Sequence, residues 1–180
     1  MIIMINGAVG SGKTSVAYML QPMLEKSIIF DPEEIGCMLK RIIPDHVRLK
    51  EEQTGDYQDM ELWGILTVKT AREMIERYNT DLIIPTTIYK PEIFEFIVKE
   101  LKAIDPELYH FCLEASESTI YQRLKKRGDE LNEYTYTQTL KYTEAFKNHR
   151  FEQFIQTDDK DTDDIVSVIM NQLPVYQQLQ

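Results

Sequence analysis

A glycine-rich stretch close to the start of the chain has the spacing of a phosphate-binding loop. Within "INGAVGSGKTS", the Walker A pattern G-x-x-x-x-G-K-[ST] is satisfied by Gly7, Gly12, Lys13 and Thr14. In this pattern backbone N–H groups surround the phosphates, the lysine reaches the β and γ oxygens, and the hydroxyl binds Mg²⁺. We therefore expect a site for ATP and Mg²⁺, with Thr14 as the metal ligand and Lys13 also taking part in catalysis. The expected nucleotide-binding residues are Gly7, Ala8, Val9, Gly10, Ser11, Gly12, Lys13, Thr14 and Ser15.

The residues on both sides of this loop favour the same interpretation. "MIIMIN" before it is an apolar run typical of a buried strand, and "TSVAYMLQPML" after it has apolar residues at helical spacing. A strand, a glycine loop and a helix N-terminus together form an anion-binding site. The alternative is a glycine-rich turn without a ligand. Pro22 predicts that the first helix kinks or ends near Gln21, because proline lacks an N–H and clashes with the preceding turn.

Asp31 is the main candidate for a catalytic base. It follows a second short apolar run, "KSIIF", and ligands of α/β proteins bind beyond the carboxyl ends of the strands. There a carboxylate can accept a proton from a hydroxyl group that attacks the γ-phosphate. The stretch "DPEE" also fits a helix start, with Asp31 as N-cap, Pro32 as first helical residue and Glu34 in a capping box. The two roles are compatible.

The third expected strand, "DLIIPTTI", ends without the aspartate that helps hold Mg²⁺ in many phosphate-loop proteins. Pro85, Thr86 and Thr87 stand there instead, so the metal is expected to rest on Thr14, phosphate oxygens and water, with Asp31 acting through water. The two threonines either offer hydroxyls to an acceptor or, as β-branched residues, simply suit a strand end. The missing aspartate also keeps open a nucleotide-binding role without phosphoryl transfer.

Two arginines in "YQRLKKRG" are candidates for stabilising the transferred phosphoryl group. Arg123 and Arg127 lie four residues apart, on one face of a predicted helix, where guanidinium groups can neutralise developing charge. The alternative is a solvent-exposed face paired with nearby acids. Three aromatic residues, Trp63, Tyr57 and Tyr89, are candidates for the lining of an apolar or aromatic acceptor pocket. For Trp63 the alternative is a place in the core.

Strands that alternate with helices predict an α/β fold with a mainly parallel sheet. The expected strands are 1–6, 26–31, the second part of 79–88 after a turn, 107–115 and 152–157, and the expected helices after the first are 32–43, 56–78, 90–104, 116–128 and 161–173. The segment 132–150 is polar, aromatic and only loosely periodic. It is either a mobile cover over the nucleotide or a plain surface helix.

The composition limits the class of protein. A chain of 180 residues without linker-like stretches or repeats predicts one domain, and a formal charge of −10 argues against a nucleic-acid partner. Its apolar runs fall far short of the ~20 residues that span a bilayer, and no secretory signal is visible, so we expect a cytoplasmic protein. Cys37 and Cys112 match no metal or redox spacing and are expected to be small apolar fillers. The three histidines, His46, His110 and His149, form no ligand cluster.

The chain as a whole resembles the ATP-binding tunicamycin-resistance proteins of bacteria. The matching landmarks, in order up to about Leu173, are "INGAVGSGKT", "DPEEIG", Pro44, "LW", "IIPTTI", "RLKKR" and "FIQTD". This resemblance implies a three-layer P-loop NTPase fold of the nucleotide-kinase type, with a central parallel five-stranded sheet in the order 2-3-1-4-5. It also implies an arginine-bearing lid segment at about 128–150 within a single domain, 1–180. The chain is similar as well to small antibiotic phosphotransferases whose base follows the second strand, which supports Asp31, and the lid supports Arg123 and Arg127.

The function implied is an ATP- and Mg²⁺-dependent phosphotransferase that acts on a small-molecule hydroxyl, nucleoside-like or belonging to an antibiotic of the tunicamycin type. A second possibility is an ATP-dependent protein that sequesters an antibiotic without modifying it. A third is a regulatory ATPase that acts on a protein partner, although the chain has little room for an effector domain.

Overall fold

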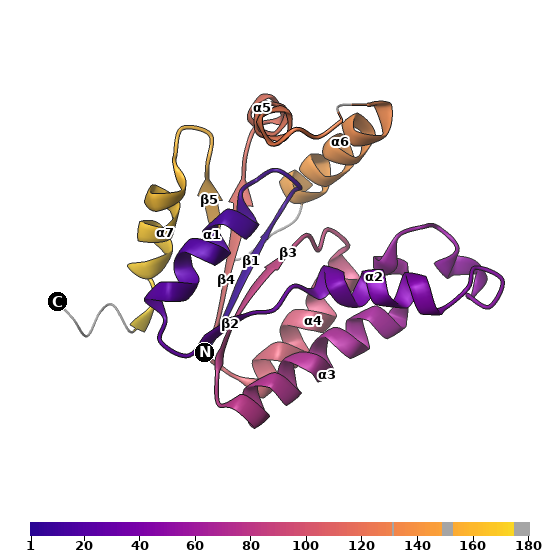
Figure 1. Ribbon diagram of the computed structural model, residues 1–180, viewed down its shortest axis with the longest axis horizontal. Coiled ribbons are helices and arrows are strands. Elements are labelled where there is room, and N and C mark those ends of the chain that lie inside the picture. The colour runs from indigo at the N-terminus through magenta and orange to yellow at the C-terminus, as the bar shows by residue number, and fades with distance from the viewer. Residues whose placement is uncertain (131, 149–152, 175–180) are drawn as a thin grey trace.

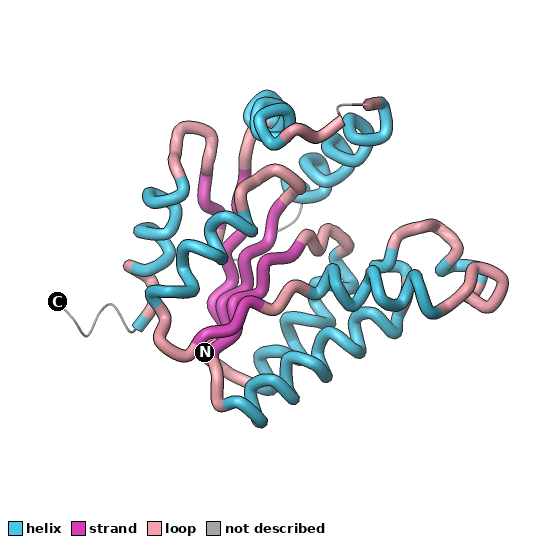
Figure 2. Tube along the Cα trace, viewed as in Figure 1, coloured by secondary structure: helices cyan, strands magenta, loops and turns pink. Residues whose placement is uncertain are grey.

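The computed structural model describes residues 1–130, 132–148 and 153–174. Five parallel strands form one sheet in the order β2-β3-β1-β4-β5 (Figure 2). The strands are β1 (Ile2–Gly7), β2 (Ser27–Ile29), β3 (Asp81–Thr86), β4 (Leu108–Glu114) and β5 (Phe154–Gln156). The predicted α/β fold and its strand order are therefore confirmed. His149 and the ends of the predicted segments 132–150 and 152–157 lie outside the described residues.

Helices cover both faces of the sheet, as Figure 1 shows. The α-helices are α1 (Lys13–Leu20), α2 (Pro32–Ile42), α3 (Glu61–Tyr78), α4 (Pro91–Ile104), α5 (Glu117–Arg127), α6 (Glu133–Asn148) and α7 (Thr162–Met170). Three short 3₁₀ turns are η1 (Gln21–Met23), η2 (Lys50–Glu52) and η3 (Tyr57–Asp59). α1 and α7 pack on one face, α2, α3 and α4 on the other, and α5 and α6 lie beyond the carboxyl end of β4 (Figure 1).

The central strand β1 explains why the sequence before the glycine loop is wholly apolar. Ile2 and Met4 pack in the α2–α4 layer, whereas Ile3 and Ile5 pack in the α1–α7 layer, and all four side chains are fully buried. A strand covered on both faces reads as a continuous hydrophobic run. The core thus fixes the position at which β1 ends and the loop begins.

The helix boundaries agree with the sequence at Pro22 and disagree at Asp56. α1 ends at Leu20 and Pro22 lies in η1, which confirms the predicted end of the first helix. The prediction that a helix begins at Asp56 was wrong. The Asp56 side chain caps the 3₁₀ turn η3 instead, Met60 is extended, and α3 begins only at Glu61. Local capping by Asp56 therefore breaks an otherwise helical pattern.

The two cysteines lie in different environments. Cys112 is buried as predicted, but the prediction for Cys37 was wrong, because Cys37 lies on the solvent side of α2. In residues 1–130, 132–148 and 153–174, no group of three or more His, Cys, Asp or Glu side chains is placed to hold a metal ion. In the same ranges, no helix has both the length and the apolar character to cross a bilayer.

Candidate active site

A pocket of about 700 Å³ opens at the carboxyl ends of the strands. Its walls come from the glycine loop, the start of α2, the residues that follow β3, the last turns of α5 and the β5–α7 connection. This volume is typical of sites for small molecules and cofactors. All the predicted site residues except Gly7 and Ala8 border the pocket. Gly7 is the last residue of β1, and Ala8 follows it at the start of the loop.

Glycine is required by the backbone at two of the pattern positions. Gly7 has φ +148°, and a Cβ there would stand 2.5 Å from the carbonyl oxygen of Leu113. Gly12 has φ +103° at the N-cap of α1, a left-handed conformation that other residues rarely adopt. The loop consequently turns back over the end of β1 and directs the N-terminus of α1 toward the pocket.

Lys13 lies across this loop. Its Nζ donates to the carbonyl oxygen of Ala8 at 2.8 Å, and the side chain is buried. Burial lowers the pKa of Lys13 to about 8, although the carboxylates of Glu33 and Asp31 favour the charged form. The buried ammonium has lost contacts with water, and the oxygens of a bound phosphate would replace those contacts.

The groups at the loop fit a nucleotide with its metal ion. The Ser11 hydroxyl is buried without a hydrogen-bond partner among the described residues. Thr14 and Ser15 are exposed at the first turn of α1 and border the pocket. Backbone N–H groups at a helix N-terminus favour phosphate oxygens, and one threonine hydroxyl with phosphates and water is a usual magnesium environment.

Asp31 is the N-cap of α2, as the sequence predicted. Its Oδ1 accepts a hydrogen bond from the N–H of Glu33 at 2.9 Å. Burial raises the pKa of Asp31, and the charge of Glu34 adds to this effect, whereas the N–H of Glu33 opposes it. Trp63 supports the start of α2, because its fully buried indole donates through Nε1 to the carbonyl oxygen of Pro32 at 2.9 Å. Trp63 is therefore a core residue, the second of the two alternatives for it.

Glu33 is a pocket residue that the sequence reasoning missed. It borders the pocket together with Asp31, and burial followed by the charge of Asp31 raises the pKa of Glu33. The signal was present in "DPEE", where two carboxylates two residues apart follow a strand end. The site accordingly holds a pair of interacting carboxylates near Lys13.

Asn6 is a second residue that was missed. This fully buried side chain accepts from the N–H groups of Gly7 at 3.0 Å and Ile88 at 2.9 Å, and it donates to the carbonyl oxygen of Ile88 at 3.0 Å. It joins the first residue of the glycine loop to the chain that follows β3. Thr86 and Thr87 border the pocket just before this joint. No sequence spacing predicts a contact between positions 82 residues apart.

The two arginines of α5 occupy different environments. Arg123 is half-buried, and its Nη1 donates to the carbonyl oxygen of Ser11 at 3.1 Å and to Thr157 Oγ1 at 3.0 Å. Arg127 is 60% exposed and forms an ion pair with Asp129. Both border the pocket, as do two lysines that the sequence reasoning missed, Lys126 and Lys160.

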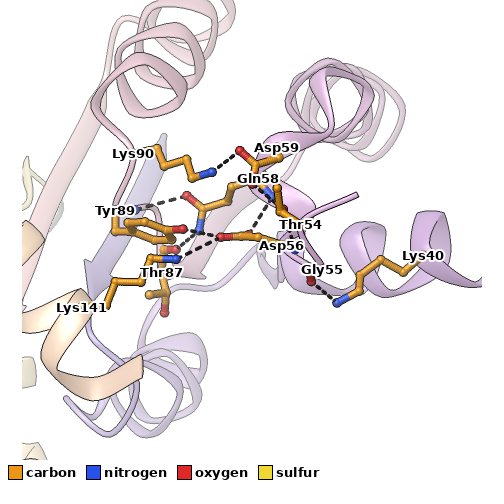
Figure 3. Close-up of polar contacts among 10 residues, drawn as sticks. All are labelled: Lys40, Thr54, Gly55, Asp56, Gln58, Asp59, Thr87, Tyr89, Lys90 and Lys141. Atoms are coloured by element: carbon orange, nitrogen blue, oxygen red, sulfur yellow. Dashed lines mark hydrogen bonds and ion pairs between the residues drawn. The ribbon is translucent and has the colours of Figure 1, made fainter. Parts of the chain in front are cut away.

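Tyr89 belongs to the polar contacts drawn in Figure 3, whereas the ring of Tyr57 packs against Trp63, and neither residue borders the pocket. The Tyr89 hydroxyl donates to Asp56. The ring of Tyr57 packs against Gly36, where a Cβ would stand 2.5 Å from Tyr57 Cγ. Burial, followed by the charge of Glu33, raises the pKa of Tyr57 above its usual range, so its hydroxyl stays neutral near the carboxylates.

The chain is similar to known proteins in its family and in its fold. A family described as an AAA domain matches residues 3–146. The chain is similar to the Deinococcus radiodurans tunicamycin resistance protein, with 25% identity and a TM-score of 0.75 over 96% of this chain and 95% of that one. No curated protein sequence matches the chain.

Two further structures share the fold. A sugar kinase from Janibacter sp. has 18% identity and a TM-score of 0.62 over 94% of this chain and 92% of that one. The Mycobacterium tuberculosis APS kinase, in complex with AMPPNP and APS, has 12% identity and a TM-score of 0.62 over 94% and 95% of the two chains. These likenesses show a kinase-like P-loop fold. Since the family match covers most of its length, the chain belongs to the AAA domain family.

Proposed function

We propose that this protein is an ATP- and Mg²⁺-dependent phosphotransferase that acts on a hydroxyl group of a small molecule. One observation carries the proposal: a single pocket brings Lys13 and Thr14 of the glycine loop together with the carboxylates of Asp31 and Glu33. In the reaction, the acceptor oxygen bonds to the γ-phosphorus while the bond from that phosphorus to the bridging oxygen of ADP breaks. Asp31 takes the proton of the acceptor hydroxyl.

Most of the charges that border the pocket are positive. The cations belong to the loop, α5 and the β5–α7 connection, and are Lys13, Arg123, Lys126, Arg127 and Lys160. Among the carboxylates, Asp31 and Glu33 belong to the start of α2, and Asp161 follows Lys160. In this proposal the nucleotide phosphates bind near the loop and α5, where Arg123 and Arg127 neutralise charge, and the acceptor binds near Asp31 and Glu33.

Mg²⁺, when bound, neutralises phosphate charge as a Lewis acid. Thr14 is the protein ligand that we propose for it, with Asp31 acting through water. The acceptor class we propose is a nucleoside-like or antibiotic hydroxyl, since one structure to which the chain is similar is named a tunicamycin resistance protein. The free thiols of Cys37 and Cys112 suit a reducing compartment, and we propose the cytoplasm.

A second candidate function is ATP-dependent sequestration of an antibiotic without phosphoryl transfer. It is favoured by the end of β3, where Pro85, Thr86 and Thr87 border the pocket in place of a metal-binding carboxylate. A sequestering protein needs the nucleotide to close the site but needs no base.

Product analysis separates the two functions. The protein is incubated with ATP, Mg²⁺ and uridine, D-glucose or tunicamycin, and the small molecules are analysed by mass spectrometry. Phosphoryl transfer predicts an ATP-dependent gain of one phosphoryl group by at least one acceptor, and this gain should be lost in Lys13→Ala but kept in the surface control Lys69→Ala. Recovery of every compound unmodified, from protein that binds ATP, would contradict the proposal and favour sequestration.

A further inference from the structure

The chain that follows β3 is held by two buried amide side chains, one on each side. Asn6 bonds both backbone groups of Ile88. Gln58, only 3% exposed, donates from Nε2 to the carbonyl oxygen of Thr87 at 2.8 Å and accepts at Oε1 from the N–H of Tyr89 at 3.3 Å (Figure 3). These backbone groups lie past the last residue of the strand, so side chains satisfy them in place of a neighbouring strand.

Gln58 is itself fixed by a well-bonded segment, residues 54–59. Asp56 Oδ1 accepts from the N–H of Gln58 at 2.9 Å, and Thr54 Oγ1 donates to Asp59 Oδ2 at 2.6 Å. Lys40 of α2 donates to the carbonyl oxygen of Gly55 at 2.7 Å (Figure 3). These bonds hold the backbone of segment 54–59, from which the Gln58 amide reaches Thr87 and Tyr89.

α6 reaches the same segment through Tyr89. The Tyr89 hydroxyl donates to Asp56, and Lys141 of α6 lies 4.6 Å above the Tyr89 ring and 3.8 Å from Asp56 Oδ2. Figure 3 shows Lys141 approaching from the side opposite to Lys40. Segment 54–59 therefore connects α2, α6 and the chain that follows β3.

We propose that Gln58 is a positioning residue for phosphoryl transfer and that it acts through Thr87. The proposal rests on the proposed function. Gln58 fixes the backbone on both sides of Ile88, so that the Thr87 side chain stays at the pocket wall, where it contacts the acceptor. Loss of the Gln58 amide releases Thr87 and loosens acceptor binding, whereas the glycine loop and its nucleotide contacts keep their own support from Asn6 and Arg123.

A first experiment tests the structural part without an acceptor. The variant Gln58→Leu is compared with Gln53→Leu, a control with the same substitution in which the lost side-chain bond, from Nε2 to the carbonyl oxygen of Arg48, lies in an exposed stretch. Hydrogen exchange of the Tyr89 N–H should be at least about tenfold faster in Gln58→Leu than in wild type, and unchanged in the control. Gln58→Glu serves if Gln58→Leu misfolds, because it keeps the acceptor for Tyr89 and loses the donor to Thr87. In Gln58→Glu the carbonyl oxygen of Thr87 loses its donor and faces a carboxylate, so this stretch should open more often and the N–H groups of Ile88 and Tyr89 should exchange faster. Unchanged exchange at positions 87–89 would overturn the proposal.

A second experiment tests the functional part with the acceptor among uridine, D-glucose and tunicamycin that wild type phosphorylates. Gln58→Leu should raise the KM for that acceptor about tenfold or more, while the Kd of AMPPNP stays within about twofold. In the double variant with Thr87→Val, the effects on KM should be clearly less than additive. An unchanged acceptor KM, or additive effects, would overturn the role of Gln58 while leaving the proposed function in place. If wild type phosphorylates no acceptor, the proposed function fails, and this role falls with it.

Discussion

Arg123 donates a hydrogen bond to the carbonyl oxygen of Ser11 at 3.1 Å, so α5 supports the glycine loop directly. The same guanidinium donates to the carbonyl oxygen of Thr157 at 2.5 Å, at the end of β5. A residue selected from the sequence for its charge therefore also ties together two connections at the carboxyl edge of the sheet. Its neighbour Arg127 is 60% exposed and paired with Asp129.

Removal of each arginine should affect the stability of the protein to a different extent. We expect Arg123→Ala to lower the free energy of unfolding by about 2 kcal/mol, because it leaves two carbonyl oxygens without their charged donor. Arg127→Ala should change it by less than about 0.5 kcal/mol, since exposed ion pairs contribute little. Urea denaturation measures both. Equal stability losses in the two variants would contradict a supporting role for Arg123.

Asp31→Asn tests the proposed base apart from the helix cap. Asparagine caps a helix about as well as aspartate, so we expect the free energy of unfolding to stay within about 0.5 kcal/mol of wild type. Turnover should fall by roughly 10²-fold or more, because the amide cannot accept the proton. Turnover within about threefold of wild type, measured at saturating ATP and acceptor, would remove this role from Asp31.

The lowered pKa of Lys13 predicts the pH dependence of nucleotide binding. The ammonium is mostly charged below its pKa of about 8, and phosphate oxygens favour the charged form. We expect binding of ATP to take up protons near pH 8.5 and affinity to fall up to about tenfold per pH unit above the pKa of Lys13. Calorimetry in buffers of different ionisation enthalpy measures the uptake. Lys13→Arg is the control, because its guanidinium stays charged and should bind without this proton uptake.

Trp63→Phe tests how the start of α2 is held. The variant keeps an aromatic ring but leaves the carbonyl oxygen of Pro32 without the indole donor, which should cost about 2 kcal/mol of stability. Because Pro32 is next to Asp31, turnover should also fall, while the Kd of ATP stays close to wild type. A loss of stability with unchanged turnover, measured at a temperature where the variant is fully folded, would show that Asp31 is positioned by its own cap alone.

Local signals account for the parts of the structure that were predicted from the sequence. The glycine loop, the end of α1 before Pro22 and the cap formed by Asp31 depend on neighbouring residues, and the sequence displays them directly. The strand order came from the family resemblance, and it is confirmed.

The parts that were missed depend on contacts between distant residues. Asn6 meets Ile88 across 82 positions, and Gln58 meets Thr87 across 29. The start of α3 was placed too early because a helical pattern does not reveal that Asp56 caps a separate turn. Glu33 was readable in "DPEE", but its place at the pocket depends on how α2 leaves the sheet.

The fate of a labelled γ-phosphate distinguishes transfer of a phosphoryl group to a small molecule from binding alone. A single turnover is run with excess protein, ATP labelled at the γ position, Mg²⁺ and the acceptor panel, and the label is then located. We predict that the label moves to an acceptor hydroxyl in wild type and stays in ATP in Lys13→Ala. Label that remains in ATP, or appears only as inorganic phosphate, with bound acceptor recovered unmodified, would show that the protein is not a phosphotransferase for these acceptors.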